Sequence, residues 1–302
     1  MQNTSRLLMI RPVNFGFNAE TAVNNAFQKN TGEDVQLKAL SEFTFFVDLL
    51  RENKVEVTVI EDSVHPSTPD SIFPNNWISF HADGRVILYP MFAVNRRMER
   101  KATVLNVVQQ LFSISEIIDL TAAEKDNLFL EGTGSMVLNR EKNIAYACLS
   151  SRTDKELFNH FCSLLNYSGV TFRAADKSGF DIYHTNVMMC IAKTFAVVCL
   201  ESVGNPLEKE VLINSIENTQ KEIIEITIDQ LNHFAGNMLQ VQNEEGELLL
   251  VMSSQAYMSL TAEQIEKLEK HNRIIHSSLD HIETTGGGSA RCMMAEIFLQ
   301  KK

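Results

Sequence analysis

The chain has 302 residues, of which 44% are hydrophobic and 22% are charged, as is typical of a globular protein. Asp and Glu number 38 against 27 Lys and Arg, and the resulting net charge of −11 argues against a nucleic-acid binder, which needs a basic face. The sequence contains no apolar run of eighteen residues, so we expect no transmembrane helix and no membrane partner.

Short β-type runs alternate with helical stretches along the chain. The β-branched and apolar runs predict strands at 7–10, 55–60, 86–89 and 196–200. Apolar residues with helical spacing predict a helix over 34–53, and similar patterns predict helices over 96–112, 154–166, 208–219 and 261–270. The last of these begins with a capping box, in which Thr261 is followed three residues later by Gln264.

The order of these elements predicts an α/β protein that is not doubly wound. No G-x-G-x-x-G follows the first strand, and the chain has no P-loop. Strand, strand, helix and strand recur about every 55 residues, which favours a ring of ββαβ units. With 6 Pro and 13 Gly and no low-complexity linker, residues 1–302 are expected to form one domain.

Five polar residues mark this repeat at nearly constant intervals. Asn76, Glu131, His184, Asn237 and Cys292 are separated by 55, 53, 53 and 55 residues, and each stands at the edge of an apolar run. We call these five the landmark residues. Equivalent positions in successive units of a ring face a common axis, so we expect the five to converge on one central pocket. A thiol, an imidazole and a carboxylate brought together in this way form a site for nucleophilic catalysis.

Six motifs in the same order resemble those of the pentein-fold guanidine-modifying enzymes, which include arginine deiminase, dimethylargininase and amidinotransferase. The similarity covers nearly the whole chain and is strongest to the arginine-deiminase-related citrulline hydrolases. The motifs are Pro69-Asp70-Ser71-Ile72-Phe73-Pro74-Asn75-Asn76, Asn95-Arg96-Arg97-Met98-Glu99, Glu131-Gly132-Thr133-Gly134, Leu149-Ser150-Ser151-Arg152-Thr153, Tyr183-His184-Thr185-Asn186 and the glycine-rich run 286–292. The resemblance implies a five-bladed α/β propeller around a central pocket.

The chemistry of these residue types suggests a role for each. Cys292 is the expected nucleophile, because a thiolate can attack a resonance-stabilised carbon and form a covalent adduct. His184 is the expected general acid and base, and Glu131 is expected to hold the N–H groups of the substrate. The ordinary alternatives are a buried free cysteine, a hydrogen-bonded core histidine and a turn carboxylate.

The remaining candidates are expected to bind the amino-acid end of a substrate or to line the pocket. Arg96 or Arg97, together with Arg152, is expected to clamp an α-carboxylate, with surface salt bridges as the alternative. Asp70 is expected to hold an α-amino group or to serve as a turn residue. Asn237 either lines the pocket or forms a turn.

The chain departs from deiminases at two positions, where Asn76 and Asn186 replace residues that are usually acidic. A buried cation without compensating negative charge is costly, whereas a neutral ureido group matches the donors and acceptors of an amide. We therefore expect citrulline to be preferred over arginine, with ornithine, carbon dioxide and ammonia as products. The alternatives are a deiminase or dihydrolase acting on arginine or an N-substituted arginine, an amidinotransferase, a cysteine protease and a non-catalytic pentein that only binds.

Cofactors, cellular location and assembly are less directly encoded. No spacing of Cys and His is typical of zinc, and neither a metal nor an organic cofactor is implied. The five cysteines, an odd number without a C-x-x-C motif, and the absence of a signal-peptide pattern before Arg11-Pro12 favour a reducing cytoplasm. A small amino acid is the expected partner. The oligomeric state stays open, with a homodimer formed through strand edges as one option.

Overall fold

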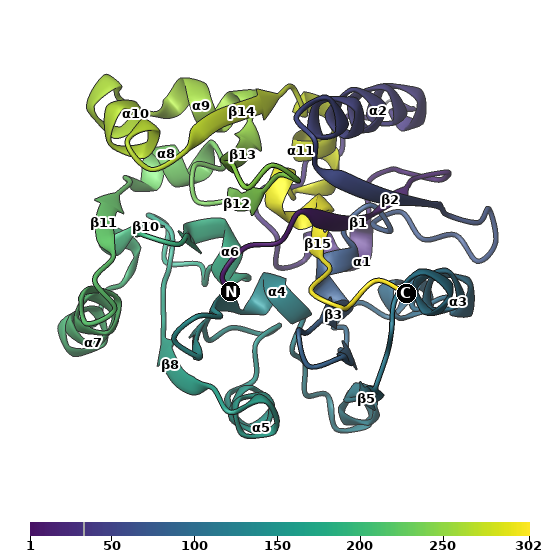
Figure 1. The fold of residues 1–302 in the computed structure, drawn as a ribbon, viewed down its shortest axis with the longest axis horizontal. Helices are drawn as coiled ribbons and strands as arrows, with labels where there is room; N and C mark the ends of the chain where they lie inside the picture. Colours follow the sequence, from purple (N-terminus) through teal and green to yellow (C-terminus); the bar gives the residue numbers. More distant parts are fainter. Residues whose placement is uncertain (33) are drawn as a thin grey trace.

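A computed structural model describes residues 1–32 and 34–302 of the chain, and in these residues the strands form five three-stranded sheets around a common centre (Figure 1). Each sheet has an inner, a middle and an outer strand. In that order the sheets are β15 (Ala295–Glu296), β1 (Arg6–Arg11) and β2 (Glu56–Glu61); β3 (Ile78–Phe80), β4 (Arg85–Leu88) and β5 (Glu116–Asp119); β6 (Val137–Asn139), β7 (Ile144–Cys148) and β8 (Ser168–Phe172); β9 (Met189–Ile191), β10 (Phe195–Val198) and β11 (Glu222–Glu225); and β12 (Leu239–Gln242), β13 (Leu248–Ser253) and β14 (Arg273–Ser277).

Every sheet combines one antiparallel and one parallel pairing. The inner and middle strands pair antiparallel, as in the register Val137↔Tyr146, and a short turn joins them in four of the five sheets. The outer strand pairs parallel to the middle one, as in Ala145↔Gly169. A parallel pairing requires a crossover connection, and a helix supplies it in each sheet. The expected ring of ββαβ units is therefore confirmed.

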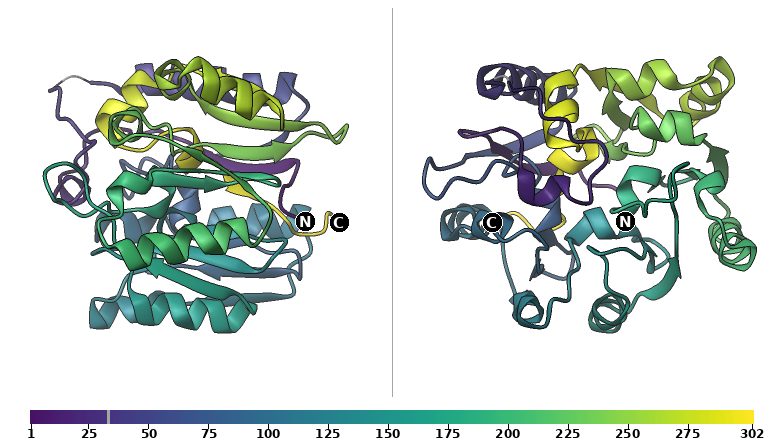
Figure 2. Two further views of the ribbon diagram at one scale, coloured as in Figure 1. Left: turned by 90° about the vertical axis from the view of Figure 1, so that its left-hand side faces the viewer. Right: turned by 180° about the vertical axis from the view of Figure 1, so that it is seen from behind.

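One sheet is assembled from both ends of the chain. The middle strand β1 pairs parallel to β2, in the register Leu7↔Val57, while its inner neighbour β15 comes from the C-terminal end and pairs Leu7↔Glu296. The repeat is thus interrupted within one sheet, and hydrogen bonds between the two ends of the chain close the ring. Both termini consequently lie on the same face of the molecule (Figures 1 and 2).

The crossover helices form the outer layer of the ring (Figure 1). They are α2 (Gln36–Glu52), α3 (Ala102–Leu111), α5 (Lys155–Leu165), α7 (Pro206–Glu217) and α10 (Ala262–Glu269). Side-chain caps begin several of them: Asp154 accepts from two backbone N–H groups of α5, and the Thr261–Gln264 capping box is present at α10. The structure thus contains all five predicted helices.

Two details of the predicted helices were wrong. The segment 96–112 is not one helix, because a 3₁₀ turn, η2 (Asn95–Glu99), precedes α3. The turn buries Arg96 and Glu99, whereas α3 buries Val104 and Val108. The apolar spacing that predicts this helix includes Leu37, Phe43 and Phe46. The two phenylalanines are buried in α2, but Leu37 is 76% exposed. Leu37 therefore faces solvent, whereas Ala39 in the same turn is buried.

The shorter elements lie mainly between the sheets and at the ends of strands. They are α1 (Ala19–Ala22), α4 (Gly132–Ser135), α6 (Thr185–Met188), α8 (Ile228–Asn232), α9 (Ser254–Ser259), α11 (Asp280–Gly286), η1 (Pro74–Asn76), η3 (Thr121–Asp126), η4 (Leu200–Ser202) and η5 (Ala290–Met293). In the side view of Figure 2, α1 lies on the face opposite to the termini. The apolar core is divided into four clusters of buried side chains contributed by the sheets and the helices around them.

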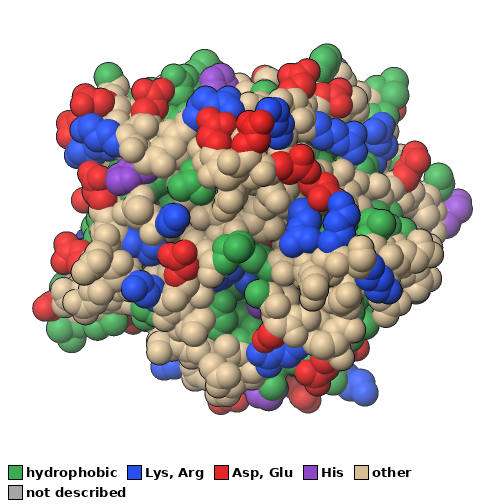
Figure 3. Space-filling view, in the orientation of Figure 1, with side chains coloured by type: hydrophobic (Ala, Val, Ile, Leu, Met, Phe, Trp, Pro, Cys, Tyr) green, Lys and Arg blue, Asp and Glu red, His purple; other side chains and the backbone are tan. Residues whose placement is uncertain are grey.

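Charged side chains of both signs lie on the face of the molecule that carries the termini (Figure 3). On the face that carries the termini, basic and acidic side chains are mixed, and no broad basic area is visible (Figure 3). A helix long and apolar enough to cross a membrane does not occur in residues 1–32 or 34–302.

Candidate functional site

The five landmark residues occupy equivalent places in the ring. Each stands in or beside a short turn that immediately precedes the innermost strand of a sheet: η1 before β3, α4 before β6, α6 before β9, the segment around Asn237 before β12, and η5 before β15. All five side chains are buried, with at most 3% of any residue exposed. The period in the sequence therefore corresponds to a repeated structural position at the centre of the ring.

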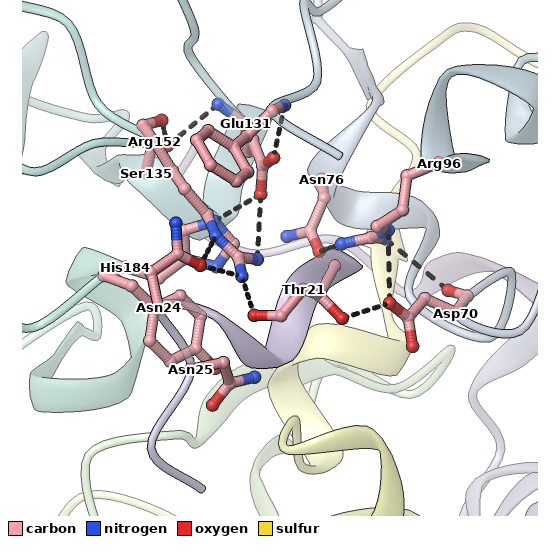
Figure 4. A network of polar contacts seen from close by, with 12 residues as sticks. Thr21, Asn24, Asn25, Asp70, Asn76, Arg96, Glu131, Ser135, Arg152 and His184 are labelled. Carbon is pink, nitrogen blue, oxygen red and sulfur yellow. Dashed lines mark hydrogen bonds and ion pairs between the residues drawn. The ribbon is translucent and has the colours of Figure 1, made fainter. Parts of the chain in front are cut away.

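Glu131 and His184 form a hydrogen-bonded pair between neighbouring turns (Figure 4). The Nε2 of His184 lies 2.8 Å from Oε2 of Glu131, while Oε1 of Glu131 accepts from the backbone N–H of Phe92 at 2.9 Å. Burial alone would raise the pKa of Glu131, but the charge of Arg152 and the hydrogen bond from His184 outweigh it and hold this pKa well below its usual range. The carboxylate is therefore ionised at neutral pH.

The ionised carboxylate determines which nitrogen of His184 carries the proton. Burial lowers the pKa of His184 to about 4, although Glu131 opposes the shift, so the imidazole is neutral near pH 7. A carboxylate only accepts hydrogen bonds, so Nε2 must be the donor and Nδ1 is left with a free lone pair. Nδ1 can therefore accept a proton and later return it.

Cys292 lies in the same cavity as His184, between two amides. The Nδ2 of Asn237 lies 3.2 Å from its sulfur, and the Nδ2 of Asn186 lies 3.6 Å away. Asn237 is itself fixed, because its Oδ1 accepts from the backbone N–H of Arg291 at 3.1 Å and its Nδ2 also donates to the carbonyl of Asn186 at 2.8 Å. These amides can donate to a negatively charged sulfur without adding charge to the site.

The glycine-rich run before Cys292 packs too closely for side chains. A Cβ atom at Gly288 would lie 2.9 Å from the ring of Phe73, and Gly287 has a φ of +65°, in the left-handed region. Behind this loop the buried Glu283 accepts from Ser289 at 2.5 Å and from Gln255 at 2.9 Å. Burial raises the pKa of Glu283 to about 7. Glu283 was not predicted from the sequence, since it lies outside the six motifs.

Asn76 presents a single type of hydrogen-bonding group to the cavity. Its Oδ1 accepts from Nη1 of Arg96 at 2.9 Å, whereas its Nδ2 is buried and has no hydrogen-bond partner among the residues that the structure describes. In Figure 4 the oxygen points toward Arg96 and the nitrogen toward the opposite side, where Glu131 and His184 lie. A guanidinium cannot accept a hydrogen bond, so the Arg96 contact settles this orientation of the amide.

Gly134 lies beside Asn76 and His184. A Cβ atom at this position would lie 2.4 Å from Nδ2 of Asn76 and 2.7 Å from Nδ1 of His184. The unpaired N–H donor and the free imidazole nitrogen are therefore close to each other, and both border the space that a glycine leaves open.

Arg96 is buried among acids. Its guanidinium makes a bidentate pair with Glu99, at 2.8 and 3.0 Å, and its Nε lies 3.9 Å from Oδ2 of Asp70. Burial raises the pKa of Glu99 to about 7 although Arg96 opposes the shift, and it also raises the pKa of Asp70. The Oδ1 of Asp70 has no hydrogen-bond partner within the described parts of the chain, so the cavity offers one unpaired acceptor as well as one unpaired donor.

The side chains of the two other candidate arginines, Arg97 and Arg152, point in different directions relative to the cavity. Arg97 turns away from the cavity and donates to the carbonyls of Met91 and Phe92. Arg152 lines the cavity, with its Nη1 3.5 Å from Glu131 and its guanidinium over the ring of Tyr183. Of the three arginines, Arg96 and Arg152 reach the cavity and Arg97 does not.

The segment 18–28, which includes α1, covers the cavity. Thr21 and Asn25 are among the lining residues, the carbonyl of Thr21 accepts from Nη2 of Arg152 at 2.7 Å, and Asn24 also accepts from Arg152 (Figure 4). These residues were not predicted from the sequence, because the segment lies outside the repeat. The only local signal was Asn18, which caps α1. Across residues 1–32 and 34–302, no three His, Cys, Asp or Glu side chains gather as a metal site would require.

Comparisons with known proteins agree with this architecture. Among solved structures, the arginine dihydrolase ArgZ from the ornithine-ammonia cycle in cyanobacteria matches with a TM-score of 0.76 at 18% identity, over 97% of this chain and 40% of that chain. The substrate-bound N-terminal domain of ArgZ matches with a TM-score of 0.76 at 17% identity, over 97% of this chain and 99% of that chain. An adduct of dimethylarginine dimethylaminohydrolase matches with a TM-score of 0.68 at 17% identity, over 97% of this chain and 99% of that chain.

The family match and the shared fold together define the class, which is the pentein guanidine-modifying superfamily. Within this class, residues 11–299 match the family described as eukaryotic N,N dimethylarginine dimethylhydrolase, and the chain belongs to that family. It spans 40% of that ArgZ chain, and a search of curated protein sequences found no match.

Proposed function

We propose that the protein hydrolyses the ureido group of citrulline, releasing ornithine, carbon dioxide and ammonia, through a covalent adduct on Cys292. Membership of a family of C–N hydrolases supports the reaction type. Cys292 is the proposed nucleophile, His184 the general acid and base, and Glu131 the group that orients His184 and accepts from substrate N–H groups. The substrate is a single small amino acid, and the proposal places the whole activity in residues 1–302.

The observation that carries the choice of substrate is the unpaired amide nitrogen of Asn76. A buried N–H donor is costly unless an acceptor reaches it. The carbonyl oxygen of a ureido group is such an acceptor, whereas a guanidinium offers only further donors. The same N–H would stabilise the oxygen as negative charge develops on it during attack, which is the purpose of an oxyanion hole. Near the sulfur, Asn186 and Asn237 contribute no charge.

The proposed reaction has two steps, the formation of a covalent adduct and its hydrolysis. The Cys292 thiol gives its proton to Nδ1 of His184, and the sulfur attacks the ureido carbon. One C–N bond then breaks as His184 returns the proton to the departing nitrogen, leaving an S-carbamoyl-type adduct. Water, activated by His184, attacks this adduct and breaks its C–S bond, which restores the thiol and releases a carbamic acid. The remaining C–N bond of the carbamic acid then breaks, releasing carbon dioxide and the second nitrogen as an amine or ammonia. Citrulline and one water thus yield ornithine, carbon dioxide and ammonia.

The polar groups at the far end of the cavity match the amino-acid part of the substrate. The unpaired Oδ1 of Asp70 can accept from an α-ammonium group. Arg152 presents its planar guanidinium to the cavity and can bind the α-carboxylate once the segment 18–28 withdraws from it. A cytoplasmic location and a homodimer remain predictions.

A second candidate is a dihydrolase that takes arginine through both hydrolytic steps. The observation in its favour is the ionised Glu131, the carboxylate nearest to His184, which can balance a guanidinium. ArgZ is named as an arginine dihydrolase, and another structure with this fold, AgrE, has been solved with L-arginine. N-substituted arginine, suggested by the name of the family, is a third substrate to include.

The test is to incubate the purified protein separately with citrulline, arginine and N,N-dimethylarginine, and to quantify ornithine, citrulline and ammonia by mass spectrometry and a coupled assay. We expect ornithine from citrulline, and none from the Cys292→Ala variant. Cys190→Ala is a matched control, because this thiol is equally buried but lies in a β-strand. Accumulation of citrulline from arginine without further conversion would contradict the proposal.

A further inference from the structure

We propose that Glu283 is a positioning residue, which holds the loop before Cys292 in place through its hydrogen bond to Ser289. Glu283 does not line the cavity, so it acts on the reaction through this loop and not through the substrate. The inference rests on the proposed function in one respect, which is the role of Cys292 as the nucleophile.

The loop that leads to Cys292 has little stiffness of its own. Gly286 ends α11, and Gly287 and Gly288 follow it before Ser289. Glycine has more backbone freedom than any other residue and has no side chain that could anchor it. The position of such a run depends on contacts from outside it, and Ser289 is the first residue after the glycines whose side chain can make one.

Hydrogen bonds hold the loop at both of its ends. Near α11, the carbonyl of Gly287 accepts from the hydroxyl of Tyr183 at 2.7 Å and from Nδ2 of Asn25 at 3.2 Å. Near Cys292, Oγ of Ser289 lies 2.5 Å from Oε1 of Glu283. Ser289 is fully buried and Glu283 is 1% exposed, so water does not compete for this short bond.

Glu283 connects the loop to a neighbouring helix. Its Oε2 accepts from Nε2 of Gln255 in α9 at 2.9 Å. The carbonyl of Ser289 accepts from the backbone N–H of Cys292 at 3.0 Å, in the 3₁₀ turn η5. A chain of hydrogen bonds thus runs from α9 through Glu283 and Ser289 to the backbone of the proposed nucleophile.

The sulfur of Cys292 depends on this placement, because its partners lie on other elements. Asn237 and Asn186 approach the sulfur with their Nδ2 atoms at 3.2 and 3.6 Å, and the thiol must give its proton to Nδ1 of His184. A shift of the loop would therefore move the sulfur relative to all three side chains. A misplacement of about 1 Å at a reacting centre can cost roughly 100-fold in rate.

A carboxylate at the other end of α11 provides a comparison. Glu42 in α2 accepts from the backbone N–H groups of His281 and Ile282 at 3.0 Å each, in the first turn of the helix. It holds the same helix but at the end remote from the loop. Loss of Glu42 should therefore weaken α11 without moving Ser289, whereas loss of Glu283 should release Ser289.

The kinetic test is a double-mutant cycle of Glu283→Ala and Ser289→Ala, measured as kcat and KM for citrulline. Each single variant should lower kcat by roughly 10- to 100-fold and change KM less. The double variant should lose less than about threefold more, because both substitutions remove the same bond. Glu283→Gln can keep both side-chain hydrogen bonds and should restore kcat to within about threefold of the wild type.

Glu42→Ala is the matched control. It should lower the denaturant midpoint of unfolding and leave kcat within about threefold of the wild type. Additive losses at positions 283 and 289, equal losses in Glu283→Gln and Glu283→Ala, or a loss of kcat in Glu42→Ala as large as that in Glu283→Ala would overturn the inference. If Glu283→Ala does not fold, Ser289→Ala carries the test, since it removes a single oxygen atom, and an unchanged kcat would then overturn the inference.

A second measurement needs no substrate. Alkylation of Cys292 and Cys190 by iodoacetamide is followed by mass spectrometry in the wild type and in Ser289→Ala. Cys292 should react roughly 10-fold more slowly in the variant, because its thiol leaves the groups that take up its proton and donate to its sulfur. Cys190, which is buried in β9, should react at the same rate in both proteins. An unchanged rate at Cys292, or faster labelling of both cysteines through general loosening, would overturn the inference.

The proposed function and this inference can fail separately. The wild-type protein alone reports on the proposed function, through ornithine released from citrulline. If it acts only on arginine or N,N-dimethylarginine, the proposed function fails, and the cycle is then measured with that substrate. Non-additive losses at positions 283 and 289 would still support the positioning role, and independent losses would overturn it.

Discussion

The substitution Asn76→Asp tests the choice of substrate most directly, because it changes one atom of the pocket from a donor to an acceptor. The shape of the side chain is kept, and Oδ1 can still accept from Arg96. The second oxygen would replace the unpaired Nδ2 and would face the carbonyl oxygen of a bound citrulline. Two acceptors would then meet where one hydrogen bond formed before.

The magnitude follows from the burial of this group. Asn76 is 3% exposed, so water cannot compensate for the lost hydrogen bond. Leaving a buried polar group without a partner costs about 1–3 kcal/mol, which corresponds to a loss of roughly 10- to 100-fold in kcat/KM for citrulline. For arginine the sign reverses, because the new carboxylate would sit beside the guanidinium and stabilise its charge. The ratio of the two kcat/KM values should therefore change by more than either value alone.

The assay compares ornithine production from citrulline with turnover of arginine for the wild type, Asn76→Asp and the double variant that adds Asn186→Asp. Asn75→Asp is the matched control, since it adds the same charge at the adjacent buried residue, which does not line the cavity. An unchanged preference in both Asn76 variants would refute the charge reasoning. An equal change with Asn75→Asp would show that charge anywhere near the site suffices.

Three further predictions follow from the geometry. Gly134→Ala should lower kcat/KM by about 100-fold or more, because its Cβ would collide with the groups that face it, while Gly204→Ala, with nothing within 4 Å, should leave activity unchanged. Arg97→Ala should change kcat/KM for citrulline by less than about threefold, because its guanidinium binds backbone carbonyls; a large rise in KM would place it at the substrate instead. Glu283 is destabilising when ionised, since its folded-state pKa of about 7 exceeds the usual 4.5. Its contribution to stability is complete below pH 4.5 and is lost as the pH rises through 7. Denaturant unfolding at pH 5 and pH 8 should therefore show the wild type losing about 3 kcal/mol relative to Glu283→Gln; parallel pH profiles would contradict this.

The sequence predicted the ring and its centre well because both repeat. The landmark residues recur in phase with the inner strands, so a period in the chain became a common position in space. Local signals also sufficed where the cause was local, as at the Thr261 capping box. The closing strand β15 has only two residues and pairs with the opposite end of the chain, and no local pattern indicates such a pairing.

Other features depend on tertiary contacts that adjacent residues do not share. Arg96 and Arg97 are neighbours in one 3₁₀ turn, and their order in the sequence does not reveal which points inward. The partner of Arg96 inside the turn, Glu99, belonged to a predicted motif but had no assigned role. The covering segment 18–28 contains neither a landmark nor a strand, so its contact with Arg152 could be seen only in the structure.

The position of Asn76 explains how one fold can serve different substrates. Each landmark precedes an inner strand, and the buried apolar residues that hold the ring together, such as Ile78 and Phe80 in β3, lie after it. A landmark can therefore change without altering the packing of its sheet. Exchanging an acid for an amide at position 76 changes the pocket from an acceptor to a donor, but only if the amide is held in one orientation. The hydrogen bond that Oδ1 of Asn76 accepts from Arg96 holds the amide in one orientation.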